Sequence, residues 1–145
     1  MKDVHQIIKK RWFVDVFPVG PLRCNCTIVG DLISGKCLVF DPGGDAHKIL
    51  DRAQAYHLNI EAILCTHAHF DHILAAGILH DLTDALIFLN VEDLLLWQAL
   101  DKQCAFFNIP YVPVMDPHNT LKDDQILPCC DGVAIHTPGH TPGSM

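Results

Sequence analysis

The sequence predicts an α/β fold in a single domain, and three observations lead to this prediction. The chain has 145 residues, half of them hydrophobic, which is enough for one domain with a buried core. Short apolar runs typical of strands alternate with segments whose apolar residues recur at helical spacing. Histidine and aspartate clusters follow directly after predicted strands, where loops converge on functional sites. We therefore treat residues 1–145 as one domain with its functional residues at strand ends.

The N-terminal third is predicted to form strands separated by turns. Its extended segments are "FVDVFPVG", "CTIVGD" and "CLVFDPGG", and the turn-like "SGK" precedes the third of them. After Asp45 the period changes, because Ile49, Leu50, Ala53 and Tyr56 recur at helical spacing. This pattern predicts a helix after the third strand, with Asp45 as its N-cap.

The alternation of strand and helix continues in the second half of the chain. "EAILCTH" and "ALIFL" are typical of strands, whereas "HILAAGILH" and "VEDLLLWQAL" are predicted to be helical. Asn90 is the expected cap of the second helix, which carries Val91, Leu94 and Leu95 on one face. From residue 101 to residue 117 we expect a proline-punctuated loop that walls a cleft, and "VAIHTPGH" predicts a last strand that ends in a turn.

Composition argues against several classes of protein. The net charge is −7, and the basic cluster at residues 9–11 is expected to be a solvated terminus, so nucleic acid is a poor partner. No apolar run reaches the roughly 18 to 20 residues of a membrane span, and the first residues do not resemble a secretory leader. Seven cysteines without a regular framework favour reduced thiols. We expect a soluble, cytoplasmic protein that binds neither nucleic acid nor membrane.

The densest cluster of ligand-type side chains is "THAHFDH", residues 66–72. His67 and His69 are two residues apart, so a chain still extended after its strand would point both imidazoles to one side, where they can share a metal ion. Asp71 and His72 follow where the chain is expected to turn into a helix, so they can serve a second ion close by. Two such cations, roughly 3.5 to 4 Å apart, would hold a bridging hydroxide and polarise a carbonyl or phosphoryl oxygen.

The donor types favour a catalytic metal centre over a structural one. Imidazole and carboxylate ligands without thiolate suit zinc, or iron or manganese. A further ligand is expected from "HTPGHTPGS", where His140 lies in a turn after a predicted strand. Gly139 and Gly143 would let the backbone approach the site closely. His136, at the end of the strand, is expected to be structural or to support the ligands.

The remaining motifs carry weaker signals. "DPGG" at residues 41–44 is either a simple turn or a segment in which Asp41 orients a metal-bound histidine. "CNC" at residues 24–26 has no second cysteine pair at zinc-ribbon spacing, so metal binding there is not expected. The other histidines lack ligand spacing and are expected at the surface; they stand at positions 5, 47, 57, 80 and 118.

The three motifs "DPGG", "THAHFDH" and "HTPGHTPGS", in this order, resemble those of the metallo-β-lactamase superfamily, and within it the glyoxalase II-like (hydroxyacylglutathione) hydrolases. The resemblance extends from about residue 13 to the end. It implies an αββα sandwich with the site at one edge of the sheets. It also implies that His67, His69 and His140 bind a first metal ion and that Asp71 and His72 bind a second, zinc being the expected metal. Asp71 is the residue expected to be catalytic.

The function that the resemblance implies is metal-dependent hydrolysis of a small-molecule thioester, in which metal-bound hydroxide attacks the carbonyl. A glutathione-linked substrate is the closest match. Two alternatives stay open. One is a mononuclear iron persulfide dioxygenase that would use His67 and His140, and the other is a fragment without catalytic role.

The sequence departs from the family pattern after "HTPGHTPGS". In the family a strand with a metal-bridging aspartate follows, and later another histidine for the second metal, whereas here the chain stops at Met145. We therefore expect a metallo-β-lactamase-like domain that is incomplete at its C-terminal end, the N-terminal portion of the sandwich. It is expected to be a portion of a longer protein, the alternative being that it assembles with another chain. Such a portion would expose apolar faces and strand edges. We expect it to be marginally stable or self-associating, to hold at most one metal ion well, and to be weakly active or inactive.

Overall fold

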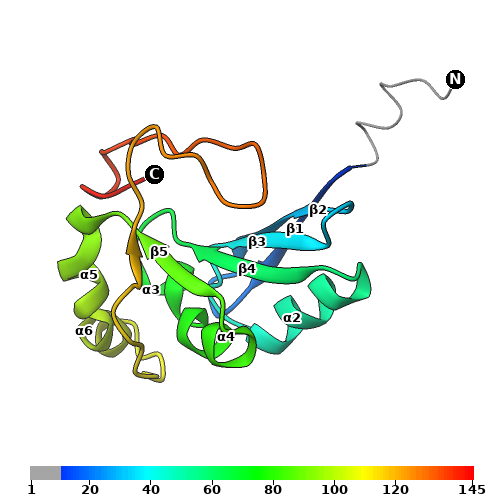
Figure 1. The fold of residues 1–145 in the computed structure, drawn as a ribbon. Helices are drawn as coiled ribbons and strands as arrows, with labels where there is room; N and C mark the ends of the chain where they lie inside the picture. The colour runs from blue at the N-terminus through cyan, green and yellow to red at the C-terminus, as the bar shows by residue number, and fades with distance from the viewer. Residues whose placement is uncertain (1–10) are drawn as a thin grey trace, which may run out of the picture.

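The computed structural model describes residues 11–145 and contains a six-stranded mixed sheet whose strands follow one another in chain order (Figure 1). Neighbours among the first three strands pair antiparallel, and the pairs from the third strand to the sixth are parallel. The strands are β1 (Trp12–Val19), β2 (Cys24–Asp31), β3 (Lys36–Phe40), β4 (Asn59–Leu64), β5 (Leu86–Leu89) and β6 (Asn119–Thr120). The α/β class predicted from the sequence is therefore confirmed.

The helices lie between the parallel strands and beyond β5. They are α2 (Ala46–Ala55), α3 (Phe70–Ile73), α4 (Ala76–Thr83), the 3₁₀ helix η1 (Val91–Asp93), α5 (Leu94–Gln98) and α6 (Leu100–Phe106). Parallel strands need such crossover connections, because a tight hairpin can join only antiparallel neighbours. The C-terminal end of β4 leads directly into the "THAHFDH" segment and α3, which places the histidine cluster at one edge of the sheet.

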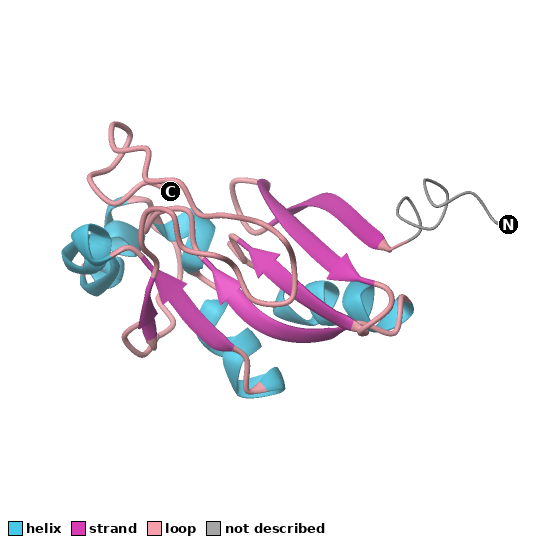
Figure 2. Ribbon diagram, turned by 45° about the horizontal axis from the view of Figure 1, so that its top comes forward, coloured by secondary structure: helices cyan, strands magenta, loops and turns pink. Residues whose placement is uncertain are grey.

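The sheet has a helical layer on one face and irregular chain on the other (Figures 1 and 2). Side chains such as Ile28, Val39 and Ile63 point into the main core, which also contains Ile49 of α2 and Leu79 of α4. Alternate residues point to the opposite face, where a smaller cluster is completed by the segment after β6. That cluster comprises Leu38, Ala62, Leu64, Leu121 and Ala134. One sheet with one helical layer is half of an αββα arrangement.

The second face of the sheet is incompletely covered in residues 11–145. Val14 and Val16 of β1 expose 62% and 56% of their surface, and Val133 and Ile135 of the covering segment are also exposed. The cover leaves an open apolar cavity of about 320 Å³ beside Thr66. The expectation of exposed apolar surface therefore agrees with the structure, whereas self-association stays a prediction.

The structure corrects three expectations about the helices. Asp45 is not a side-chain cap of α2, because it adopts φ 53° and its carboxylate instead accepts a hydrogen bond from the backbone nitrogen of Gly20. The helix expected over residues 72–80 is interrupted between α3 and α4. The stretch 101–106, expected in a loop, belongs to α6, which buries Cys104 in the core. Propensity alone did not reveal this helix, since its stability comes from tertiary packing.

Two further differences concern the second half of the chain. Asn90 does cap η1, because its side chain accepts from the nitrogen of Glu92. Val91 and Leu95 are exposed, however, and the buried residues of α5 and α6 are Trp97, Leu100 and Cys104. "VAIHTPGH" forms no strand; only Val133 makes an isolated bridge, to Ile126. The backbone of the neighbouring Ala134 bonds Asp124 and Gln125 in a local loop instead of a sheet neighbour.

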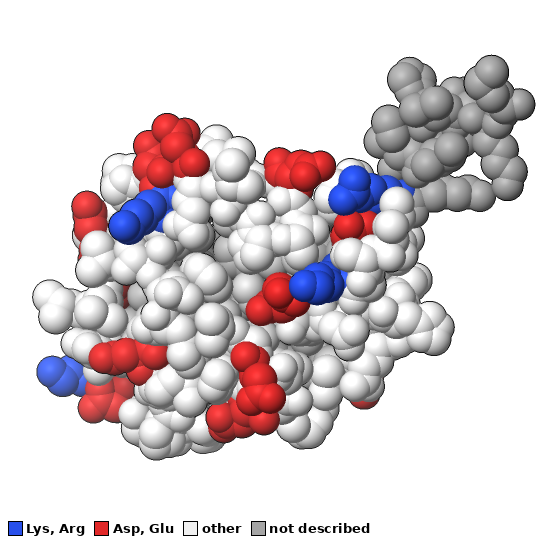
Figure 3. Space-filling model, viewed as in Figure 1, with Lys and Arg blue, Asp and Glu red and all other residues white. Residues whose placement is uncertain are grey.

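The surface agrees with the acidic composition. Figure 3 shows acidic side chains spread over the visible face with isolated basic side chains among them, and no basic stripe on this face. The basic cluster at 9–11 and His5 lie, apart from Arg11, outside the described residues. All seven cysteines are free thiols. Among the described helices there is none with the length and apolar character needed to cross a membrane.

Candidate metal centre

Three histidines from two distant segments come together at the edge of the sheet. His67 and His69 stand in the segment between β4 and α3, and His140 stands in the loop near the C-terminus. One ring nitrogen of each lies within 4.8 Å of the others, and Nδ1 of His69 is 3.0 Å from Nε2 of His140. Within residues 11–145 this is the group of metal-ligand side chains that meets this spacing. The chain bends at Thr66 and His67 and is extended at His69, before α3 begins at Phe70, so it is not extended throughout as predicted. The rings of His67 and His69 nevertheless lie close together, with centroids 4.8 Å apart.

The hydrogen bonds of His67 define its tautomer. The hydroxyl of Thr66 lies 2.7 Å from Oδ2 of Asp41 and 3.0 Å from Nδ1 of His67. A carboxylate only accepts, so the hydroxyl donates to Asp41 and accepts from the Nδ1–H of His67. The Nε2 atom of His67 then carries a lone pair, and it is buried with no hydrogen-bond partner in the described chain. A buried unpartnered imidazole nitrogen fits a metal ion, which binds the neutral ring.

Burial keeps the first two histidines neutral. The pKa of His67 falls to about 4, chiefly because burial disfavours its charged form and secondly because His72 is nearby. The pKa of His69 is also lowered, first by burial and then by the neighbouring His140. Both side chains therefore present lone pairs at neutral pH, which is the protonation state that a metal ligand needs.

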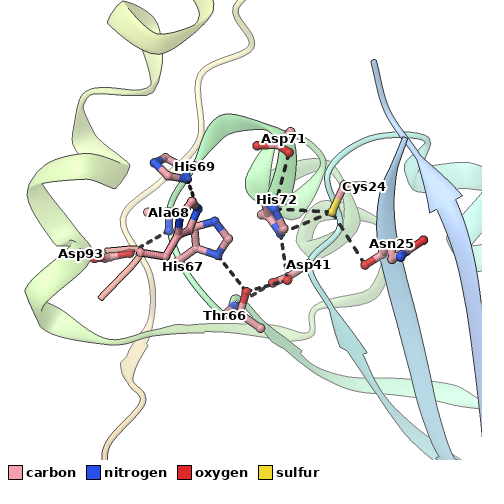
Figure 4. Close-up of polar contacts among 11 residues, drawn as sticks. Cys24, Asn25, Asp41, Thr66, His67, Ala68, His69, Asp71, His72 and Asp93 are labelled. Carbon is pink, nitrogen blue, oxygen red and sulfur yellow. Dashed lines mark hydrogen bonds and ion pairs between the residues drawn. The ribbon is translucent and has the colours of Figure 1, made fainter. Parts of the chain in front are cut away.

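Asp71 and His72 lie beside the three-histidine group but outside it. The rings of His67 and His72 have centroids 4.1 Å apart. Nδ1 of His72 contacts Oδ2 of Asp41 at 2.9 Å, and its Nε2 is 3.5 Å from Oδ2 of Asp71 (Figure 4). Burial lowers the pKa of His72, but hydrogen bonds to Asp41 and to the Sγ atom of Cys24 outweigh it and raise the pKa to about 10.

Asp41 supports the histidines and is more than a turn residue. The residue adopts φ 54° at the end of β3. Its carboxylate accepts from the backbone nitrogen and hydroxyl of Thr66 and also contacts His72 (Figure 4). Of the two interpretations of "DPGG", the orienting role is the one that this geometry supports. Gly43 of the same motif packs against the backbone of Asp71, because a Cβ there would overlap the carbonyl oxygen of Asp71.

Two polar residues that the sequence did not single out hold Ala68, the residue between His67 and His69. The amide oxygen of Gln103 accepts from the nitrogen of Phe70, and its amide nitrogen donates to the oxygens of Ala68 and Leu96. The carboxylate of Asp93 accepts from the nitrogen of Ala68 at 2.9 Å. A sequence signal existed for Asp93, since Trp97, Leu100 and Cys104 follow it at helical spacing on a buried face.

The "HTPGHTPGS" segment is ordered by its own backbone and by neighbouring loops. The nitrogen of Thr137 donates to the oxygen of Ser144, and the nitrogen of Met145 donates to the oxygen of Thr66. A Cβ at Gly143 would overlap Asp93, so this glycine allows the loop to pack closely on Asp93, whereas a Cβ at Gly139 would meet nothing within 4 Å. His136 is not among the three histidines that meet, and its Nε2 lies 2.9 Å from the oxygen of Pro142.

The thiols of "CNC" and the remaining histidines of the described chain lie outside the three-histidine group. Cys26 is fully buried in the core, and Cys24 contacts His72, so the two thiols of "CNC" do not form a cluster of their own. His47, His57 and His118 are exposed as expected, and His80 is half-buried. His80 and His118 stack with ring centroids 4.4 Å apart.

Comparisons with known proteins identify the family of this chain. The family model for the metallo-beta-lactamase superfamily matches residues 19–145. A protein of unassigned function from Aquifex aeolicus is 33% identical over 137 residues, covering 90% of this chain and 62% of its own length. The hydroxyacylglutathione hydrolase GloC of Haemophilus influenzae is 30% identical over 136 residues, covering 91% of this chain and 64% of its own.

Solved structures show the same similarity. The structure of the BLEG-1 B3 metallo-beta-lactamase superposes with a TM-score of 0.79 at 29% identity, covering 91% of this chain and 65% of that one. The structure of TTHA1623 in a di-iron-bound form superposes with a TM-score of 0.74 at 31% identity, covering 90% of this chain and 64% of that one. The chain thus spans a little under two thirds of the length of these relatives.

Proposed function

Because this chain belongs to the metallo-β-lactamase superfamily, we propose that it carries the primary metal site of a thioester hydrolase. Superfamily membership supports a metal-dependent hydrolase in general, and relatives include a metallo-hydrolase and a zinc-dependent hydrolase by name. The thioester class is suggested by the hydroxyacylglutathione hydrolase from Haemophilus influenzae. The substrate we propose is a small-molecule thioester, with glutathione as the thiol carrier.

The observation that carries this proposal is the Nε2 atom of His67, buried and without a hydrogen-bond partner in the described chain. A buried polar atom without a partner costs about 1 to 3 kcal/mol, and a bound cation would remove that cost. Nitrogens of His69 and His140 lie close enough to complete a three-histidine ligand set. Three protein ligands with a position left open are typical of catalytic zinc sites. Members of this superfamily bind divalent metal ions, and the di-iron relative shows that the metal varies.

Each residue of the site has a proposed role in metal binding or catalysis. A divalent cation, when bound, lowers the pKa of water and polarises a carbonyl oxygen. His67, His69 and His140 would hold that cation, and Thr66 keeps His67 in the tautomer that leaves Nε2 free. Asp71 and His72, beside the group, are the proposed ligands of a second ion. Because the pKa of His72 is raised to about 10, His72 would have to lose its proton before it binds that ion. Asp71 is also the proposed catalytic residue, since its carboxylate lies at the edge of the centre.

The test combines metal content with turnover. The 145-residue chain is loaded with zinc, dialysed and measured by elemental analysis, and thiol release from an acylglutathione thioester is followed. His140→Ala is the matched variant, because His140 is exposed and its removal leaves the core intact. We expect the chain to retain zinc and His140→Ala to retain much less.

Each outcome separates one part of the proposal from another. Equal zinc in both proteins would overturn the three-histidine centre. Retained zinc with weak or no thiol release would support the metal centre and agree with the expectation that residues 1–145 alone are weakly active or inactive. Retained iron with oxygen consumption on a persulfide would move the activity to the dioxygenase class.

A further inference from the structure

Asp93 is a fully buried carboxylate at the junction of η1 and α5, with 0% of its surface exposed. An aspartate at a helix N-cap normally accepts hydrogen bonds from its own helix. Asp93 occupies the N-cap position of α5 but makes no side-chain cap bond there. Its two carboxylate oxygens instead accept hydrogen bonds from other segments of the chain. A buried carboxylate is costly unless it is hydrogen-bonded, so those partners indicate what it does.

The partners of Asp93 lie in the two segments that supply the histidines. Oδ2 accepts from the nitrogen of Ala68 at 2.9 Å and from the hydroxyl of Thr141 at 2.8 Å. Oδ1 accepts from the nitrogen of Gly143 at 2.7 Å. Ala68 stands between His67 and His69, and Thr141 directly follows His140. One side chain therefore bonds both ligand-bearing segments at positions adjacent to the ligands.

The packing around this carboxylate leaves little freedom. A Cβ at Gly143 would lie 2.7 Å from the nitrogen of Asp93 and 2.8 Å from its Cγ, so the loop can approach this closely only with glycine. The hydroxyl of Thr141 also bonds Ser144, whose own hydroxyl accepts from the nitrogen of Thr141. The loop that carries His140 is thus pressed onto Asp93 and bonded to it at two points.

We infer that Asp93 is the positioning residue of the metal centre: it holds the His67 and His69 segment against the His140 loop at the spacing that a single cation requires. The inference rests on the proposed metal centre. Asp93 itself does not coordinate the ion, since its two oxygens are occupied by three donors from Ala68, Thr141 and Gly143. It acts through the histidines, as residues behind metal ligands do when they set ligand orientation.

The test measures zinc and cobalt affinity of the chain by chelator competition and by the visible absorption bands of bound cobalt. Asp93→Asn keeps the size of the side chain but replaces an acceptor with a donor that faces other donors. We expect its metal affinity to fall about 10- to 100-fold, the range found when residues behind metal ligands are changed. The cobalt bands should also change shape, because the ligand geometry relaxes.

Asp31→Asn is the matched control, since Asp31 is another buried, hydrogen-bonded aspartate, paired with Arg11 and remote from the histidines. It should lose stability and keep the metal affinity of the unmodified chain. Should Asp93→Asn fail to fold, Thr141→Val removes one of the bonds to Asp93, and Thr141→Ser restores the hydroxyl. We then expect weakened binding for the valine variant and recovery for the serine variant.

A second readout in the chain without added metal separates this inference from the proposed function. Hydrogen exchange at the backbone nitrogens of Ala68 and Gly143 should be faster in Asp93→Asn than in Asp31→Asn, after correction for global stability. Failure of the unmodified chain to bind metal would overturn the proposed function, and the exchange rates would still decide the role of Asp93. Metal affinity and exchange in Asp93→Asn and Thr141→Val equal to those of the unmodified chain would overturn the inference.

Discussion

The hydroxyl of Thr66 accepts a hydrogen bond from Nδ1 of His67 at 3.0 Å and donates one to Oδ2 of Asp41 at 2.7 Å. This relationship makes Thr66 the link between the "DPGG" and "THAHFDH" motifs. It fixes which nitrogen of His67 is free, and that nitrogen is the buried one without a partner in the described chain. The metal affinity of such a site depends on the residue that orients the ligand as well as on the ligand itself.

Thr66→Val should therefore weaken metal binding. The valine keeps the shape of the side chain but removes the acceptor of His67, so the ring loses its preferred tautomer and orientation. We expect zinc affinity to fall about 10- to 100-fold, measured by chelator competition. Thr66→Ser, which retains the hydroxyl, should bind zinc nearly as tightly as the unmodified chain. Equal affinity in the valine and serine variants would contradict the role assigned to this hydroxyl.

Gln103→Ala should destabilise the fold. The substitution removes three hydrogen bonds. It takes the partner from the oxygen of Ala68 and the nitrogen of Phe70, whereas the oxygen of Leu96 still accepts from the nitrogen of Ala99. We expect the free energy of unfolding to fall by about 1 to 3 kcal/mol, measured by urea denaturation. Gln98→Ala is the control, because Gln98 is exposed and bonds only Asp116 at the surface, so its loss should cost within about 0.5 kcal/mol. Similar losses for both variants would argue against the role of Gln103.

Gly43→Ala and Gly139→Ala form a matched pair of glycine substitutions near the centre. The added methyl group at position 43 overlaps the backbone of Asp71, whereas that at position 139 meets nothing within 4 Å. We expect Gly43→Ala to cost about 1 to 3 kcal/mol or more through overpacking and to displace Asp71 and His72. Gly139→Ala should leave stability unchanged within about 0.5 kcal/mol. Thermal unfolding of both variants gives the comparison, and a stable Gly43→Ala protein would show that the segment shifts freely.

Acid should remove a contribution from the pair formed by Asp31 and Arg11. The hydrogen bond from Arg11 lowers the pKa of Asp31 from its usual 3.8 to about 2. The folded state therefore binds fewer protons than the unfolded state, so the pair stabilises the fold above pH 4 and loses this effect as the pH falls toward 2. Urea denaturation from pH 6 to pH 2 should show the unmodified chain losing its advantage over Asp31→Asn in this interval. A constant difference between the two proteins would contradict the assignment.

Much of the fold was predictable because its signals are local. Short apolar runs bounded by turn residues marked β1 to β5, and the helical spacing of Ile49 and Ala53 marked α2, because both signals are contained in neighbouring residues. The errors concern features that depend on distant partners. Asp45 looks like a cap in sequence, yet its carboxylate bonds Gly20 from another turn. The strand expected at Val133 needs a neighbouring strand, and in residues 11–145 it finds a single bridge partner.

The types and order of the histidines and aspartates already show which ligands the chain offers, and they limit the metals that would fit. How those side chains are held depends on three-dimensional packing. Asp93 joins two segments that are far apart in the chain, and Thr66 selects the free nitrogen of His67. Both effects depend on distances between atoms of separate elements, and a linear pattern contains no such distances until packing of the core has fixed them.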